Sequence, residues 1–183
     1  MANGWLGEGG KMNGIFVPDI EAEIIPEVGA AGFMLGDSYL SVLGLVGAVS
    51  WYESDSGIHE LLHKNKGWIG VRKRLGPRGD GGSIITLTYM NSLIVLAFEN
   101  SATLYQIILG DGYFGSFQGV RVGDSLSSLE KDFELDFNDD EFLVLNEGGY
   151  VVGISFITDY RASLLCAPNQ TIKYISVHDW ALR

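Results

Sequence analysis

Cysteine and proline are scarce in this 183-residue chain. The single cysteine, Cys166, excludes an intramolecular disulfide, which fits a protein of a reducing compartment. Four prolines stand against 25 glycines, and glycines between apolar segments favour strands with tight turns over a helical bundle. No apolar run reaches the ~18 residues that span a bilayer. We find no signal-peptide pattern at the N-terminus either. The sequence therefore predicts a globular cytoplasmic protein without membrane association.

Basic residues are also few, since 12 Lys and Arg stand against 23 Asp and Glu, for a net charge of −11. Such a surface repels nucleic acid and anionic lipid and attracts a basic protein. High acidity is also common in proteins that need it only for solubility. The basic residues are concentrated between positions 53 and 82, where half of them occur: Lys64, Lys66, Arg72, Lys73, Arg74 and Arg78.

One short motif occurs twice. Residues 32–38 and 119–125 both read Gly-x-x-(Leu/Val)-Gly-Asp-Ser, and an apolar-periodic segment follows each copy. We expect the Asp or Ser to cap a short helix, and the preceding glycine, Gly36 or Gly123, to adopt a backbone conformation closed to other residues. Leu40, Leu43 and Val46 are spaced as on one face of the first helix. Leu126 and Leu129 take that role in the second.

Strand patterns surround both motifs. The expected strands are 15–17, 23–25, 84–89, 93–98, 104–109, 142–145, 150–157 and 172–177. The sequence predicts an α+β fold of two tandem repeat units, each with a short helix and an antiparallel sheet of about three to four strands, in which strands dominate. The first unit spans residues 15–112 and holds the basic insertion 53–82. The second spans 113–183, and residues 1–14 form a flexible N-terminal arm.

The densest acidic stretch is the main candidate site. Between residues 124 and 147 nine acidic side chains stand against Lys131 alone, a net charge of −8. Residues 132–137 alternate Asp-Phe-Glu-Leu-Asp-Phe, which as a strand places the carboxylates on one face. A charged edge strand that blocks aggregation has the same pattern. A calcium loop starting at Asp132 is disfavoured, because Phe137 and Leu143 occupy positions that require Gly and Glu. The candidate partner-binding residues are Asp132, Glu134, Asp136, Asp139, Asp140 and Glu141.

A second motif has the form of an enzyme signature. His59-Glu60-Leu61-Leu62-His63 matches H-E-x-x-H and resembles the zincin metalloprotease motif, which implies zinc held by His59 and His63 with Glu60 as general base. The Lys64–Gly67 segment that follows is charged and ends in glycine, which argues against a long core helix. A short amphipathic helix with Leu62 buried is the alternative. The sequence contains no other catalytic motif, and we expect no cofactor.

The tandem Gly-Asp-Ser units, at 24–52 with 84–109 and at 115–178, resemble the repeat of β-lactamase-inhibitor-type domains. That resemblance implies a concave sheet that faces a protein partner. Size, acidity and the lack of a catalytic set are similar to those of immunity proteins that neutralise bacterial polymorphic toxins, such as contact-dependent-inhibition or type VI effectors. We therefore expect a non-enzymatic protein that binds a basic protein toxin. A zinc-dependent hydrolase and a small-ligand carrier that uses the apolar sheet face remain as alternatives.

Overall fold

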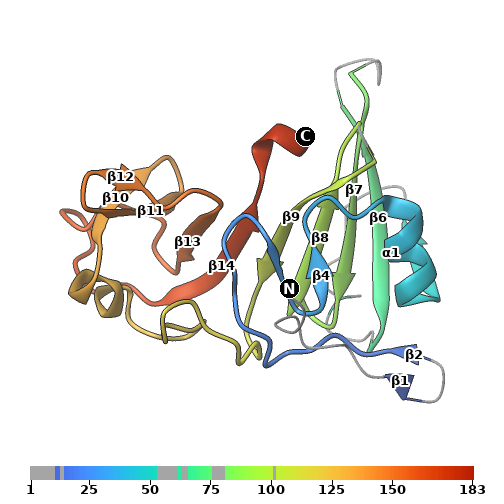
Figure 1. Cartoon of the computed structure of the whole chain (residues 1–183), viewed down its shortest axis with the longest axis horizontal. Coiled ribbons are helices and arrows are strands. Elements are labelled where there is room, and N and C mark those ends of the chain that lie inside the picture. The colour runs from blue at the N-terminus through green and yellow to red at the C-terminus, as the bar shows by residue number, and fades with distance from the viewer. Residues whose placement is uncertain (1–10, 13–14, 53–61, 63–65, 76–80, 101) are drawn as a thin grey trace, which may run out of the picture.

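Strands dominate the computed structural model, which describes residues 11–12, 15–52, 62, 66–75, 81–100 and 102–183 (Figure 1). In these residues a ten-stranded mixed sheet has the order β10-β11-β13-β14-β9-β8-β7-β6-β5, and β12 pairs with β11 beside this path. The strands are β5 Val49–Tyr52, β6 Trp68–Arg74, β7 Ser83–Tyr89, β8 Ile94–Phe98, β9 Leu104–Leu109, β10 Glu134–Asn138, β11 Glu141–Asn146, β12 Gly149–Tyr150, β13 Ile154–Thr158 and β14 Ile172–His178.

Smaller elements cover and connect this sheet. Two short hairpins pair β1 (Lys11–Met12) with β2 (Ile15–Phe16), and β3 (Gly29–Ala30) with β4 (Phe33–Met34). The helix α1 (Tyr39–Val46) lies beside β6, at the end of the sheet opposite to β10 (Figure 1). Two 3-10 helices are η1 (Leu126–Lys131) and η2 (Trp180–Leu182).

The predicted fold class of two tandem helix-plus-sheet units is wrong. The last strands of the two expected units, β9 and β14, pair with each other, with Ile107 opposite Val177 and Leu109 opposite Ile175. The strands therefore form one continuous sheet, and β5 adds a parallel strand to it. The second expected helix is the 3-10 helix η1.

The first Gly-Asp-Ser motif fixes the start of β9. The Gly36 N–H donates to the Leu104 carbonyl at 2.9 Å, and the Leu104 N–H donates to the Asp37 carbonyl at 2.8 Å. Ser38 caps α1 as predicted, because its Oγ accepts from the Ser41 N–H at 3.2 Å. The Asp37 carboxylate instead accepts from the Met34 N–H at 3.1 Å and closes the preceding turn.

The second motif makes the same backbone bonds at the start of β14. The Gly123 N–H donates to the Ile172 carbonyl at 2.8 Å, and the Ile172 N–H donates to the Asp124 carbonyl at 2.9 Å. The Asp124 carboxylate accepts from the Arg121 N–H at 2.8 Å, so it also closes a turn. Ser125 makes no capping bond to η1. Each copy of the motif thus makes two backbone hydrogen bonds to the start of a central strand, and we call this pair of bonds a clamp.

The hydrophobic core lies between the sheet and the covering segments. Val42 and Val46 of α1 are buried in it, whereas Leu40 is 77% exposed, so the predicted apolar face of α1 is wrong at that position. Leu126 and Leu129 of η1 are buried, as predicted. Because these groups come from both halves of the chain, one large core cluster spans the sheet, and a smaller cluster of Leu62, Ile69 and Val71 lies apart from it.

Strand predictions at 84–89, 93–98, 104–109 and 172–177 are confirmed to within one residue. The predicted strand 150–157 divides into β12 and β13, because Gly153 at φ +82° turns the chain between them. The expected insertion 53–82 contributes β6 to the sheet. The expected strand 23–25 is reduced to one bridge between Ile25 and Gly29. Most of the predicted arm 1–14 lies outside the described residues.

Glycine-to-alanine substitutions test the clamps. Gly36 and Gly123 have φ of +92° and +93°, and an added Cβ at either would meet no atom within 4 Å. Gly36→Ala and Gly123→Ala should therefore each cost about 1 kcal/mol of unfolding free energy through backbone strain alone. Gly44→Ala, in the interior of α1 and equally free of contacts, should stabilise by about 0.5–1 kcal/mol. Urea denaturation measures the unfolding free energy of all three variants. Equal changes at the three sites would contradict the role given to the positive φ of Gly36 and Gly123.

Candidate protein-binding site

β10 forms one edge of the described sheet and carries the alternating acidic sequence. It pairs antiparallel with β11, with Leu135 opposite Val144 and Phe137 opposite Phe142. Leu135 and Phe137 pack against the core, so the intervening Glu134 and Asp136 project from the opposite face. The predicted separation of carboxylates from apolar groups is confirmed from residue 134 onward.

The turn between β10 and β11 places two more carboxylates in solvent. Asn138 and Glu141 are paired across the strands, so Asp139 and Asp140 form a two-residue turn, with Asp139 at φ +54°. Asp140 lies 3.7 Å from the Arg161 guanidinium, with both side chains more than half exposed. An ion pair this exposed contributes less than about 1 kcal/mol, and an incoming cation can replace Arg161 at little cost.

Two of the six candidate carboxylates accept hydrogen bonds from hydroxyl groups. The Tyr150 hydroxyl donates to Asp136 Oδ2 at 2.6 Å, and this bond with the charge of Asp136 raises the pKa of Tyr150. The Ser155 hydroxyl donates to Glu141 Oε2 at 2.7 Å. Glu141 therefore belongs to the half-buried interior of the sheet more than to its surface, and it is the weakest member of the predicted set.

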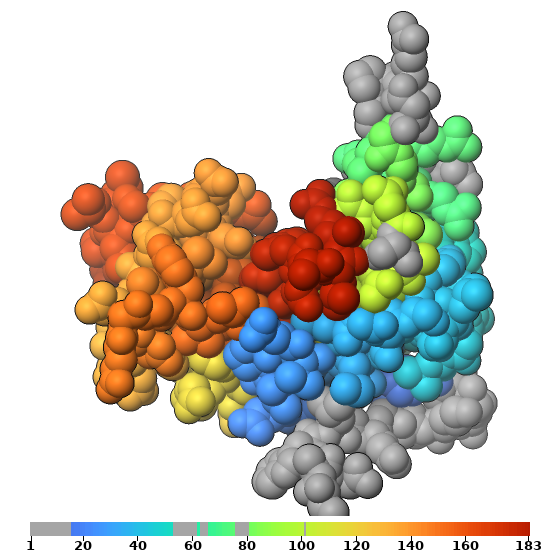
Figure 2. All heavy atoms as spheres, turned by 45° about the horizontal axis from the view of Figure 1, so that its top comes forward, coloured from blue at the N-terminus to red at the C-terminus, as the bar shows by residue number. Residues whose placement is uncertain are grey.

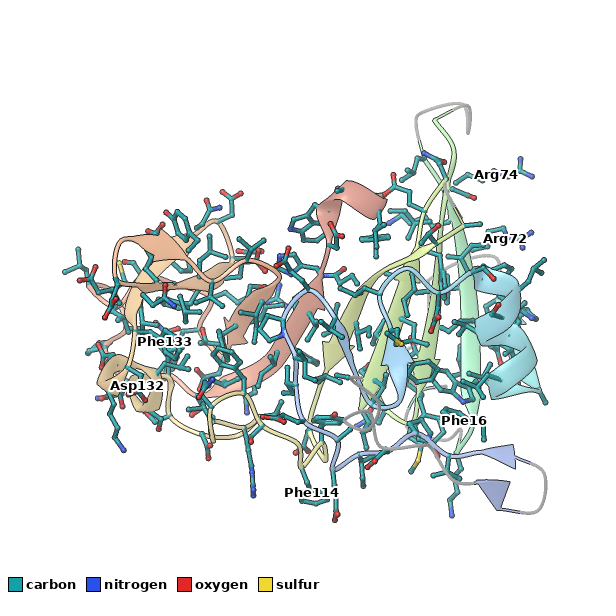
Figure 3. All side chains as sticks on the ribbon, viewed as in Figure 1. Phe16, Arg72, Arg74, Phe114, Asp132 and Phe133 are labelled. Carbon is teal, nitrogen blue, oxygen red and sulfur yellow. The ribbon has the colours of Figure 1, made fainter. Side chains whose placement is uncertain are left out.

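Asp132 and Glu134 lie along a cleft of about 340 Å³. Asp132 follows η1 and lies beside Phe133 (Figure 3). The Phe133 ring packs on Phe117 at a centroid distance of 5.5 Å. Glu130 and Glu147 also line this cleft and were not among the predicted site residues. Their place in the acidic stretch was the available signal, but only the fold shows that the β11–β12 turn returns beside η1.

The structure thus gathers the predicted carboxylates along one edge but divides them into groups. Asp132 and Glu134 line the cleft, Asp139 and Asp140 occupy the turn, and Asp136 lies between them with Tyr150. Clustered carboxylates attract cationic groups and repel one another in the absence of a partner. The arrangement suits binding of a basic surface.

A buried histidine lies on the central strand β14. His178 is 6% exposed, its Nδ1 has no hydrogen-bond partner, and its ring stacks on Trp180 of η2 at 4.5 Å. The C-terminal segment that carries Trp180 lies between the orange strands and the yellow-green strands in Figure 2. Burial lowers the pKa of His178 below its ordinary value, against the opposing charges of Glu141, Asp179 and Glu27.

The zinc motif cannot be placed, because His59, Glu60 and His63 lie outside the described residues. Leu62, within the motif, is buried against Ile69 and Val71. Within the described ranges, His, Cys, Asp and Glu side chains form no cluster of three that could hold a metal ion. The zinc hypothesis stays a prediction, which stoichiometric zinc in the purified protein, lost in His59→Ala, would support.

The carrier hypothesis needs an open apolar sheet face. One face of the sheet is filled by the chain's own side chains, including fully buried Phe33, Phe98, Phe142 and Phe156. A ligand on that face would have to displace the core.

None of the helices formed by the described residues is long and apolar enough to cross a membrane.

Comparison with known proteins gives little. No protein-family model and no curated protein matches this chain. A solved structure, that of the uncharacterized protein yfeY from Escherichia coli, is similar over 72% of this chain and 100% of that chain, with a TM-score of 0.43 and 13% sequence identity. At that level of similarity, neither fold nor function is transferred from it.

His178 predicts a pH dependence of stability. Its pKa is lowered from 6.5 in the folded state, so the unfolded chain binds more protons just below that pH. The stability that neutral His178 contributes is therefore complete above pH 6.5 and is lost as the pH falls below it. Urea denaturation between pH 5.5 and 7.5 should show a steeper loss for the natural chain than for His178→Gln. Parallel curves would show that His178 does not carry this dependence, since both proteins share the other two histidines.

Proposed function

We propose that this chain is a non-enzymatic binding protein, and specifically a cytoplasmic immunity protein that neutralises a basic protein toxin. The supporting observation is the exposed acidic edge formed by β10 and its turn, where Glu134, Asp139 and Asp140 project into solvent. The resemblance to immunity proteins in size and acidity supports the toxin as partner. The single cysteine, which excludes an intramolecular disulfide, supports the reducing cytoplasm as its compartment.

A firmly held edge suits this role. The outward carboxylates of β10 are positioned by its pairing with β11 and by Leu135 and Phe137 in the core. Binding therefore requires little ordering of the backbone, which lowers its entropic cost. The net charge of −11 adds long-range attraction, so that a basic toxin is captured quickly at low salt.

Asp140 and Asp136 already contact side chains of this chain, and both can still bind a cationic group of the toxin. Arg161 holds Asp140 in the free protein at 3.7 Å. A lysine or arginine of the toxin can replace it, and the displaced guanidinium stays solvated. Asp136 can keep its bond to Tyr150 while it accepts a second donor, because a carboxylate has about four lone-pair sites.

A triple substitution tests this site. Asp136→Asn, Asp139→Asn and Asp140→Asn together remove three charges and keep the side-chain shapes, and Asn tolerates the positive φ of Asp139. With the toxin encoded beside this gene as partner, we expect affinity to fall at least about tenfold and its dependence on salt to flatten. Surface plasmon resonance at several salt concentrations measures both.

The matched control is Glu21→Gln, Glu23→Gln and Asp111→Asn, three exposed acids away from β10. This control changes the net charge equally and should reduce the association rate slightly, with little change in dissociation. If both triple variants weaken binding equally, the docking site is wrong and only net charge matters. If the protein binds no product of its gene neighbourhood and gives no protection from it, the proposed function itself is wrong.

A further inference from the structure

The opposite end of the sheet has the opposite charge. Residues 39–52 and 66–75, which hold α1, β5 and β6, contain four basic residues and no acidic one. Arg72 and Arg74 project from β6, far from the acidic edge where Asp132 lies (Figure 3). In a chain of net charge −11, this end is a local exception that the acidic edge does not explain.

Trp51 is the central side chain of this basic end. It lies on β5, remains 42% exposed, and makes an edge contact with Tyr39 at a centroid distance of 6.4 Å. Its indole rests on Gly70, where an added Cβ would lie 2.5 Å from the ring. Tyr39 is held in turn by Phe98 at 5.4 Å. A large aromatic group is thus fixed in position while much of its surface faces solvent.

Arg72 lies over this tryptophan, with its Cζ 5.9 Å from the ring centroid. A guanidinium stacked in this way keeps its in-plane N–H donors available for a carboxylate. Among the described residues, no carboxylate pairs with Arg72 or Arg74. The site therefore combines an apolar surface with an anion-binding group that the described residues leave open.

A cleft of about 260 Å³ lies between these groups, lined by Tyr39, Leu43, Trp51, Tyr52 and Arg72. The helix α1 contributes Tyr39 and Leu43 to this lining and carries no charged residue. Trp, Tyr and Arg are the residue types that dominate binding energy at protein interfaces, and a rigid aromatic anchor loses little entropy on binding.

We propose that this cleft is a second docking site, which receives an acidic segment of a partner protein that carries a large apolar side chain. The apolar side chain packs on Trp51 and Tyr39, and a neighbouring carboxylate pairs with Arg72. The partner is acidic, because the site is basic, and we take it to be a different protein, because a net charge of −11 on each of two copies opposes their approach. The inference is independent of the proposed toxin.

Short peptides are suitable probes. Nuclear magnetic resonance follows the four tryptophan indole N–H signals during titration with acetyl-Asp-Leu-Phe-Glu-amide. The Trp51 signal, assigned by its loss in Trp51→Phe, should shift in a saturable way. The sign-reversed acetyl-Lys-Leu-Phe-Lys-amide and the apolar-free acetyl-Asp-Gly-Gly-Glu-amide should each bind at least about fivefold more weakly, because each lacks one of the two contacts.

Matched variants locate the site. Arg72→Gln and Trp51→Ala should each weaken binding of the acidic peptide at least about fivefold. Arg121→Gln, an exposed arginine elsewhere, and Trp180→Ala, a 47% exposed tryptophan that packs on Tyr105 of β9, should leave it unchanged. Thermal unfolding checks that each variant remains folded.

Gly70→Ala tests the seating of Trp51 without any change of charge. The new methyl group would meet the indole at 2.5 Å, so the ring must move from its place beside Arg72. Binding of the acidic peptide should fall about as far as in Trp51→Ala. Because the indole is 42% exposed, its displacement removes little buried surface, and we expect the protein to stay folded.

Three results would overturn the proposal: no shift of the Trp51 signal, equal shifts with all three peptides, or unchanged binding in Arg72→Gln and Gly70→Ala. A Trp51 signal that moves with protein concentration alone would replace the partner protein with a second copy of this chain.

Discussion

The antiparallel pairing of β9 with β14 is the contact on which the remaining structure depends. Ile107 and Leu109 on one strand face Val177 and Ile175 on the other, and all four are fully buried. Each strand begins where a Gly-Asp-Ser backbone clamp fixes it. The pair joins the strands on its two sides into one sheet over a shared core, so the positions of both sheet ends follow from it.

Because the sheet is continuous, it holds the acidic and the basic residues at opposite ends. The acidic stretch forms one edge of the sheet at β10, and the basic residues of β6 lie near the other edge, beside β5. Opposite charges held apart by a rigid sheet cannot neutralise one another. Exposed aromatic groups accompany the charges at both ends, with Tyr150 at the acidic end and Trp51 at the basic end, and both proposed docking sites depend on this separation.

Local patterns in the sequence predicted local structure well. Alternation fixed the faces of Glu134 and Asp136, and the glycines of both motifs have the expected positive φ. The union of two expected sheets was not predictable, because pairing of β9 with β14 depends on contacts distant in the chain. The exposure of Leu40 was missed because helical spacing does not say which neighbouring face packs. Likewise, the packing of Trp51 on Gly70 depends on the pairing of β5 with β6, which no local sequence pattern predicts.

Native-state hydrogen exchange tests the single sheet most directly. The account predicts that amides of β9 and β14 exchange slowest, and that those paired in β11 and β13 and in β7 and β8 open only with them, at the free energy of global unfolding. If the strands β10 to β13 instead exchanged as a separate unit, at a free energy well below that of β6 to β9, the account of one sheet with two charged ends would be contradicted.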